Sequence, residues 1–265
     1  MDALSRSNVR VVGNPDGPPM VLAHGFGCDQ GMWRYVVPQL EATHRIVLFD
    51  HVGAGGSDAA SFDPVHHGRL DGYAEDVVDI LDALGLGPVT FVGHSVSAMI
   101  GVLAARVRPD LVGTLVLVSP SPRYIDDDGY LGGFSQDEID ELLETMDDNY
   151  LGWSAHIAPV IMGRPDRPEL GEELTASFCR MDPSIARHFA RTTFLSDNRA
   201  DLEGVTTPAL VVQCRQDAIA PLEVGTYVHE RLENSRLVVL DTVGHCPNLS
   251  APDQLVAAIA TFLAA

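Results

Sequence analysis

The stretch TFVGHSVSAMIG, residues 90–101, decides the fold because an apolar, β-prone segment runs directly into small residues that keep a helical pattern. Ser95 stands where the strand should turn into the helix, and the letters around it nearly spell G-x-S-x-G. That motif marks a tight strand-to-helix turn that exposes a serine hydroxyl at a sheet edge. Its fifth position is Ser97 here, in place of glycine. The stretch is therefore either a nucleophile elbow or a Gly-Ser turn in an ordinary βα unit.

Strand-like and helix-like segments alternate on both sides of this turn, which is typical of βα units. The strand candidates are residues 8–13, 19–25, 44–50, 89–94, 113–119, 208–214 and 235–241. The helix candidates between them are residues 73–84, 96–106, 222–232 and 252–263. Several strand candidates are nearly continuous apolar runs, which suit strands covered on both faces. The pattern predicts an α/β fold with a mostly parallel central sheet flanked by helices.

The alternation stops between about residues 123 and 199, where no strand pattern occurs. An amphipathic helix is indicated there by Ile139, Leu142, Leu143 and Met146. Ser135 is its expected N-cap, and Glu138 completes a capping box. Further helical pieces are expected at residues 153–161, 169–180 and 183–193. We predict a helical lid over residues 123–199, inserted into a core formed by residues 1–122 and 200–265.

The composition excludes several functions. The chain has 265 residues, enough for one large domain, and its 17 basic against 37 acidic residues give a formal charge of −20. Such a charge repels phosphate backbones and anionic lipids, so neither nucleic acid nor a membrane is an expected partner. The chain contains no lysine. This excludes a lysine Schiff base and a phosphate-binding P-loop.

The termini and cysteines predict a cytoplasmic protein. No basic segment followed by an apolar run opens the chain, and no long uncharged apolar stretch interrupts it. The four cysteines, Cys28, Cys179, Cys214 and Cys246, show no C-x-x-C spacing. We interpret them as buried thiols in a reducing compartment.

A serine hydroxyl becomes a strong nucleophile only beside a base, and the base needs an acid to orient it. Asp217 follows the strand candidate 208–214, and His245 follows 235–241. Parallel strands present their carboxyl ends at one edge of a sheet, so Asp217 and His245 should meet Ser95 there. Alone, each partner reads as an ordinary loop residue. The chain order Ser, Asp, His together with the positions at strand ends favours a catalytic triad.

An ester-cleaving triad also needs two backbone N–H donors for the developing oxyanion. Val96, directly after the nucleophile, is the first candidate. The second is Phe26, in the turn HGFG that follows the strand candidate 19–25. A plain glycine-rich turn is the alternative interpretation of HGFG.

No cofactor and no metal are expected. The glycines of LFDHVGAGGSD, residues 48–58, suggest a dinucleotide fingerprint, but Asp58 stands where the third glycine should be. A turn that shapes the rim of the site explains them better. His24, the pair His66–His67 and His94 form no metal-ligand motif.

With these residues in place, the chain resembles the α/β-hydrolase superfamily. More narrowly, it resembles the branch that joins bacterial RsbQ-type stress regulators to plant strigolactone and karrikin receptors. The resemblance spans residues 9–263 and is carried by HGFGCDQGMW, RIVLFDHVGAGGSD, VGHSVSAMIG and GHCPNLSAPD. GHSVSAM is similar to the plant form of the elbow, whereas RsbQ-type proteins more often keep glycine where Ser97 stands.

The resemblance implies an α/β-hydrolase fold with a four-helix lid above a deep apolar pocket. The implied pocket residues are Phe26, Tyr124, Phe134, Trp153, Ile157 and Phe194, with Ile157 where the plant proteins tend to carry an aromatic residue. The expected activity is that of a serine hydrolase acting on a small apolar ester or a butenolide-like lactone. The alternative is a small-molecule sensor that activates a PP2C-type phosphatase partner.

Overall fold

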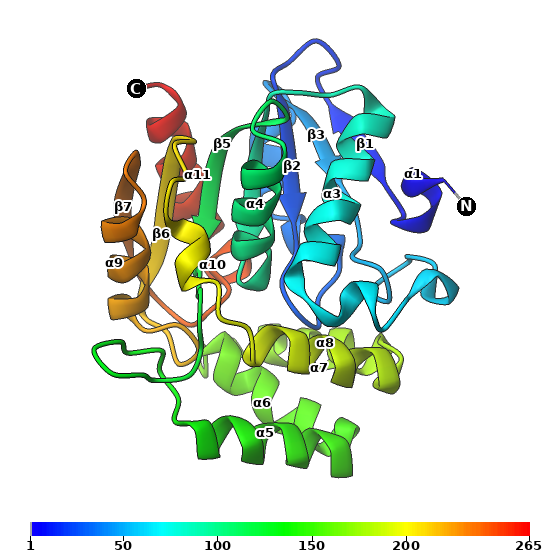
Figure 1. Ribbon diagram of the computed structural model, residues 1–265, viewed down its shortest axis with the longest axis vertical. Helices are drawn as coiled ribbons and strands as arrows, with labels where there is room; N and C mark the ends of the chain where they lie inside the picture. The colour runs from blue at the N-terminus through cyan, green and yellow to red at the C-terminus, as the bar shows by residue number, and fades with distance from the viewer. Residues whose placement is uncertain (1) are drawn as a thin grey trace.

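The central feature of the fold is a seven-stranded sheet with strand order β1-β3-β2-β4-β5-β6-β7 (Figure 1). The computed structural model describes residues 2–265. The strands are β1 (Arg10–Gly13), β2 (Pro19–Ala23), β3 (Arg45–Leu48), β4 (Val89–His94), β5 (Val112–Val118), β6 (Ala209–Gln216) and β7 (Ser235–Val243). β1 is antiparallel to β3, and every other neighbouring pair is parallel. The predicted mostly parallel sheet is confirmed.

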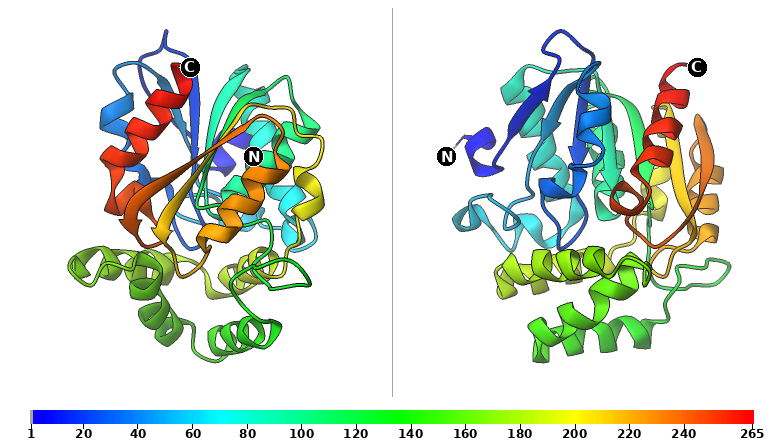
Figure 2. Two further views of the ribbon diagram at one scale, coloured as in Figure 1. Left: turned by 90° about the vertical axis from the view of Figure 1, so that its left-hand side faces the viewer. Right: turned by 180° about the vertical axis from the view of Figure 1, so that it is seen from behind.

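Helices cover both faces of this sheet. α3 (Leu70–Leu84), α4 (Val96–Val107) and α9 (Leu222–Arg231) lie on one face, while α2 (Val37–Leu40) and α11 (Pro252–Leu263) lie on the other (Figure 2). The central strands are buried along almost their whole length, as their apolar runs predict. β1 at the edge is largely exposed.

Four further helices gather beyond the carboxyl ends of the parallel strands (Figures 1 and 2). They are α5 (Gln136–Asp148), α6 (Tyr150–Met162), α7 (Pro168–Arg180) and α8 (Pro183–Phe194). The capping box at the start of α5 is present, with Ser135 and Glu138 each bonded to the other's backbone N–H. The division into a core and a lid of residues 123–199 stays a prediction, and these helices are its physical basis.

Short helical turns complete the described chain. They are α1 (Ala3–Arg6), η1 (Gln30–Trp33), η2 (Ala59–Ser61), η3 (His66–Gly68), η4 (Arg199–Leu202) and α10 (Pro247–Ser250). Across residues 2–265, no helix combines the length and apolar character that crossing a membrane requires.

Candidate active site

Ser95 occupies a strained turn between β4 and α4. Its backbone angles, φ 57° and ψ −125°, are rare for a residue with a side chain. A Cβ on Gly93 would lie 2.2 Å from the Ser97 carbonyl oxygen, so only glycine fits before the turn. These features answer the question raised by the sequence: residues 93–97 form a nucleophile elbow.

Ser97 is accommodated at the fifth position of the G-x-S-x-G motif because its hydroxyl forms hydrogen bonds with two buried polar groups. The side chain is fully buried, and its O–H donates to the His24 carbonyl at 2.5 Å. The Nε2 atom of His51 lies 2.7 Å from the same oxygen. Since the only hydroxyl proton points at His24, the His51 Nε2–H must be the donor in the second bond. Ser97 therefore links the elbow to the turn that begins at His24.

His24 and His51 are kept neutral by their surroundings. Burial lowers the pKa of His24 and lowers that of His51 well below its usual value. His24 Nε2 accepts the His51 backbone N–H at 3.0 Å, so its Nδ1–H faces the Gly25 carbonyl at 2.8 Å. The hydrogen bonds of these two imidazoles go to Gly25, His51 and Ser97. Neither ring is bonded to Ser95, whose hydroxyl lies against His245.

The predicted triad residues meet at the carboxyl edge of the sheet. The Oγ atom of Ser95 lies 2.8 Å from His245 Nε2, and His245 Nδ1 lies 2.7 Å from Asp217 Oδ2. All three side chains are buried, and that of Asp217 is fully so. Because Nδ1–H donates to the carboxylate, the lone pair of Nε2 faces the serine hydroxyl. This tautomer can remove the Ser95 proton.

Asp217 is held in place by the loop that carries it. Its Oδ1 accepts the backbone N–H groups of Ile219 at 2.8 Å and Ala220 at 3.1 Å. Oδ2 is left for His245. Three donors on one carboxylate whose side chain is fully buried satisfy its charge.

His94, beside the nucleophile, supports the other side of the triad. Its Nε2–H donates to the His245 carbonyl at 2.8 Å. Burial lowers the pKa of His94 to about 3, so the ring stays neutral. His94 thus fixes the backbone of the catalytic loop without adding a competing charge.

Two backbone amides, those of Val96 and Phe26, are the predicted donors to an oxyanion. Val96 begins α4, so its N–H is one of the unpaired donors at a helix N-terminus. Phe26 lies in the turn after β2, and that turn approaches the elbow so closely that a Cβ on Gly25 would lie 3.1 Å from the Ser95 Cβ. Within residues 2–265, neither amide donates to a protein group in the loop and cap hydrogen bonds. The assignment of Phe26 and Val96 as the oxyanion hole stays a prediction.

A small apolar cavity opens at Ser95, between the sheet and helices α5 to α8. The predicted pocket residues that line it are Phe26, Tyr124, Trp153, Ile157 and Phe194. Burial raises the pKa of Tyr124 to about 12, so its phenol is neutral. The centre of a water-sized sphere can move through about 30 Å³ of the cavity. This narrow space beside the nucleophile favours a small substrate.

Phe134 is a correction to the predicted pocket, because it is not among the residues that line this cavity. Its backbone pairs with Tyr124 and Asp126, and its half-buried side chain packs against the core before α5 begins. The sequence also missed lining residues, among them Cys28, Leu142, Leu174, Phe178 and Cys246. Phe178 follows no motif, whereas Cys246 directly follows His245 and Cys28 directly follows the HGFG turn.

Comparison with known proteins identifies the family to which the chain belongs. The sequence profile of the "Alpha/beta hydrolase family" matches residues 20–258. The chain therefore belongs to the α/β hydrolase family, as the sequence resemblance predicts.

Individual relatives within this family are similar to the chain over most of its length. The chain is 41% identical over 250 residues to "Karrikin insensitive 2 receptor CA" of Petunia hybrida, covering 94% of this chain and 92% of the relative. It is 39% identical over 254 residues to "Strigolactone esterase RMS3" of Pisum sativum, covering 95% of this chain and 94% of the relative. The solved structure of olei00960, a hydrolase from Oleispira antarctica, matches with a TM-score of 0.96 and 40% identity over 99% of this chain and 96% of that chain. The resemblance to the plant receptor branch is confirmed.

Proposed function

We propose that this hydrolase is a serine esterase in which Ser95, His245 and Asp217 form the catalytic triad. The observation that carries the proposal is the continuous hydrogen-bonded chain from the Ser95 hydroxyl through both ring nitrogens of His245 to the Asp217 carboxylate. The relative named "Strigolactone esterase RMS3" supports an ester as the substrate class. An apolar cavity at the nucleophile favours an uncharged substrate.

In the proposed first step, the Ser95 oxygen attacks the ester carbonyl carbon while His245 Nε2 takes the hydroxyl proton. Asp217 stabilises the imidazolium that forms. The carbonyl oxygen becomes an oxyanion and binds the amides of Phe26 and Val96, aided by the positive end of α4. The intermediate then collapses: the C–O bond to the alcohol breaks, and His245 gives its proton to the leaving oxygen.

An acyl group is then bound to Ser95. Water gives a proton to His245 and attacks the acyl carbon through a second oxyanion, after which the acid leaves and Ser95 recovers its proton. In a lactone the alcohol and the acid are parts of one molecule, so a ring-opened hydroxy acid would result. A butenolide-like lactone is thus a second substrate form for the same steps.

The test is hydrolysis of p-nitrophenyl acetate combined with labelling by a fluorophosphonate. Wild-type protein should turn over the ester and carry the label on the peptide that contains Ser95, and Ser95→Ala should lose both. Ser61→Ala is the matched control, since it removes a hydroxyl bonded to the neighbouring Asp58, outside the triad. Absence of both turnover and label in folded wild-type protein would contradict the proposal.

A second candidate function is sensing of a small molecule. The relative named "Karrikin insensitive 2 receptor CA" supports it, because that name describes a receptor on a chain of similar length and sequence. In this form the same cavity would bind or slowly cleave a ligand, and helices α5 to α8 would present a surface to a PP2C-type phosphatase. Co-purification with such a phosphatase that depends on the exposed face of α5 would favour sensing. Rapid multiple turnover without any partner would favour the esterase.

A further inference from the structure

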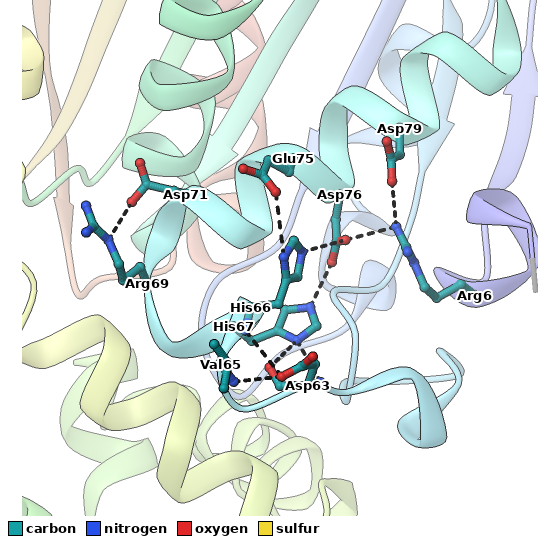
Figure 3. A network of polar contacts seen from close by, with 10 residues as sticks. All are labelled: Arg6, Asp63, Val65, His66, His67, Arg69, Asp71, Glu75, Asp76 and Asp79. Atoms are coloured by element: carbon teal, nitrogen blue, oxygen red, sulfur yellow. Dashed lines mark hydrogen bonds and ion pairs between the residues drawn. The ribbon is translucent and has the colours of Figure 1, made fainter.

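A second cluster of reactive side chains lies outside the triad. His66 and His67 of η3 and Asp76 of α3 bring together two imidazoles and a carboxylate (Figure 3). One ligand atom from each lies within 4.8 Å of the others, and no second group of this kind occurs within residues 2–265. The proposed ester chemistry does not use these residues. We propose that they form a binding site for a divalent metal ion of the zinc class.

The distances fit such an ion. Two ligand atoms about 2.05 Å from Zn²⁺ at a tetrahedral angle lie roughly 3.3 Å apart. His66 Nε2 lies 3.3 Å from Asp76 Oδ1, and His67 Nε2 lies 3.0 Å from Asp76 Oδ2. Each imidazole nitrogen thus lies at about the distance between two ligands of one ion from one of the two oxygens of the Asp76 carboxylate. One ligand atom of each residue lies within 4.8 Å of the other two, and the partly exposed His66 ring has room to turn toward a bound ion.

The His67 imidazole is oriented by a hydrogen-bond partner at Nδ1, which is how metal-bound histidines are usually held. His66 Nδ1 lies 3.6 Å from the Glu75 carboxylate. His67 Nδ1 lies 3.0 Å from the Asp63 carbonyl and 3.1 Å from the Asp63 amide nitrogen. His67 is therefore satisfied in either tautomer. Its Nε2 can donate to Asp76 when no ion is bound and can present a lone pair when one is.

The local charge also favours a cation. Apart from the two imidazoles, Asp76 is contacted by Arg6, whose guanidinium lies 2.9 Å from Asp76 Oδ1 and 3.2 Å from the Asp79 carboxylate. A surface cavity lined by Arg6, His66, Glu75, Asp76 and Asp79 connects the cluster to solvent. The carboxylates outnumber the guanidinium there, so an arriving cation is attracted. Two imidazole nitrogens select zinc-class ions over Mg²⁺ and Ca²⁺, which prefer oxygen ligands.

A bound metal ion would link η3 to α3. η3 and α3 supply the ligands, and the His67 carbonyl accepts a hydrogen bond from the Thr192 hydroxyl of α8 at 3.0 Å. The site therefore lies at the base on which one helix of the predicted lid rests. Its expected effect is on stability, separate from the ester chemistry at Ser95.

The experiment uses the full chain after dialysis against a chelator. Titration with ZnCl2 by calorimetry should show one saturable site, and Co²⁺ should give the visible absorption of a four-coordinate ion. The melting temperature should rise with Zn²⁺ and stay unchanged with Mg²⁺. His66→Arg places a guanidinium between Glu75 and Asp76 and offers no ligand, so it should weaken Zn²⁺ binding by about 100-fold or more. His66→Ala replaces it if the arginine variant does not fold.

His156→Ala is the matched control, because it removes an exposed imidazole of α6 that belongs to neither site. It should bind Zn²⁺ as the wild type does. No saturable binding by the wild type, or equal binding by wild type and the folded His66 variant, would overturn the proposal. Because the readouts are heat, absorbance and melting temperature, the result is independent of whether the protein cleaves esters.

Discussion

Ser97→Ala is the substitution that best tests how the elbow is built. It removes one hydroxyl that serves two buried groups, the His24 carbonyl and the His51 Nε2–H. A buried polar group left without a partner costs about 1–3 kcal/mol, so two should lower the free energy of unfolding by about 2–6 kcal/mol. At about 2–4 °C per kcal/mol for a domain near this size, the melting temperature should fall by roughly 4–24 °C.

The same change should slow catalysis. The His24 carbonyl lies two residues before Phe26, so loss of its anchor frees the turn that carries a predicted oxyanion donor. A small misplacement near a reacting centre can lower the rate up to about 100-fold. We expect kcat for p-nitrophenyl acetate to fall by about tenfold or more, with KM nearly unchanged because Ser97 lies outside the cavity lining.

Calorimetric melting, urea unfolding and steady-state kinetics measure these effects. Ser154→Ala is the matched control: Ser154 is also fully buried, but its hydroxyl only donates to the Tyr150 carbonyl one helical turn before it. It should change stability by less than about 1 kcal/mol. In Ser97→Ala the Nε2–H of His51 is left without a partner. The double variant Ser97→Ala/His51→Phe lacks this donor as well, so it should recover part of the lost free energy of unfolding. The reasoning is refuted if Ser97→Ala changes neither stability nor kcat by more than the control does.

The triad, the cavity and the cysteines each give a further prediction. Asp217→Asn should lower kcat by about 10⁴-fold, because the amide favours the wrong His245 tautomer; a loss of under about tenfold in steady-state kinetics would argue against the triad. Rates for p-nitrophenyl esters should fall from acetate to octanoate, because the cavity leaves only about 30 Å³ to the centre of a water-sized sphere; a flat profile would mean that the cavity opens freely. Cys179 is exposed, which corrects the interpretation of all four cysteines as buried thiols. Alkylation at about pH 8 should modify Cys179 and spare Cys28 and Cys214, since burial raises the pKa of each to about 12 and leaves them protonated. Mass spectrometry that found Cys28 modified first would contradict that burial.

The sequence predicted the secondary-structure elements and caps that depend on residues close together in the chain. β4 and α11 begin and end at the predicted residues, and the capping box at Ser135 is present. The meeting of Ser95 with His245 also followed, because parallel strands end at a common edge. In each case the signal lies in neighbouring residues or in the order of elements.

Features that depend on packing between distant segments were missed. Phe178 reaches the cavity because Gly27 leaves the space that its ring fills: a Cβ there would lie 1.5 Å from the ring. Phe134 carries the same apolar signal but packs elsewhere. No sequence pattern pairs His67 with Asp76, since η3 must fold back on α3 before they touch. Such contacts are set by tertiary structure alone.

The most direct test of the central claim is acid quenching during turnover of p-nitrophenyl acetate, followed by peptide mass spectrometry. The account predicts one acetyl group on Ser95, formed by the wild type and absent from His245→Ala. Continued turnover with the acetyl group on another residue, or with no acyl-enzyme under any quench time, would contradict it.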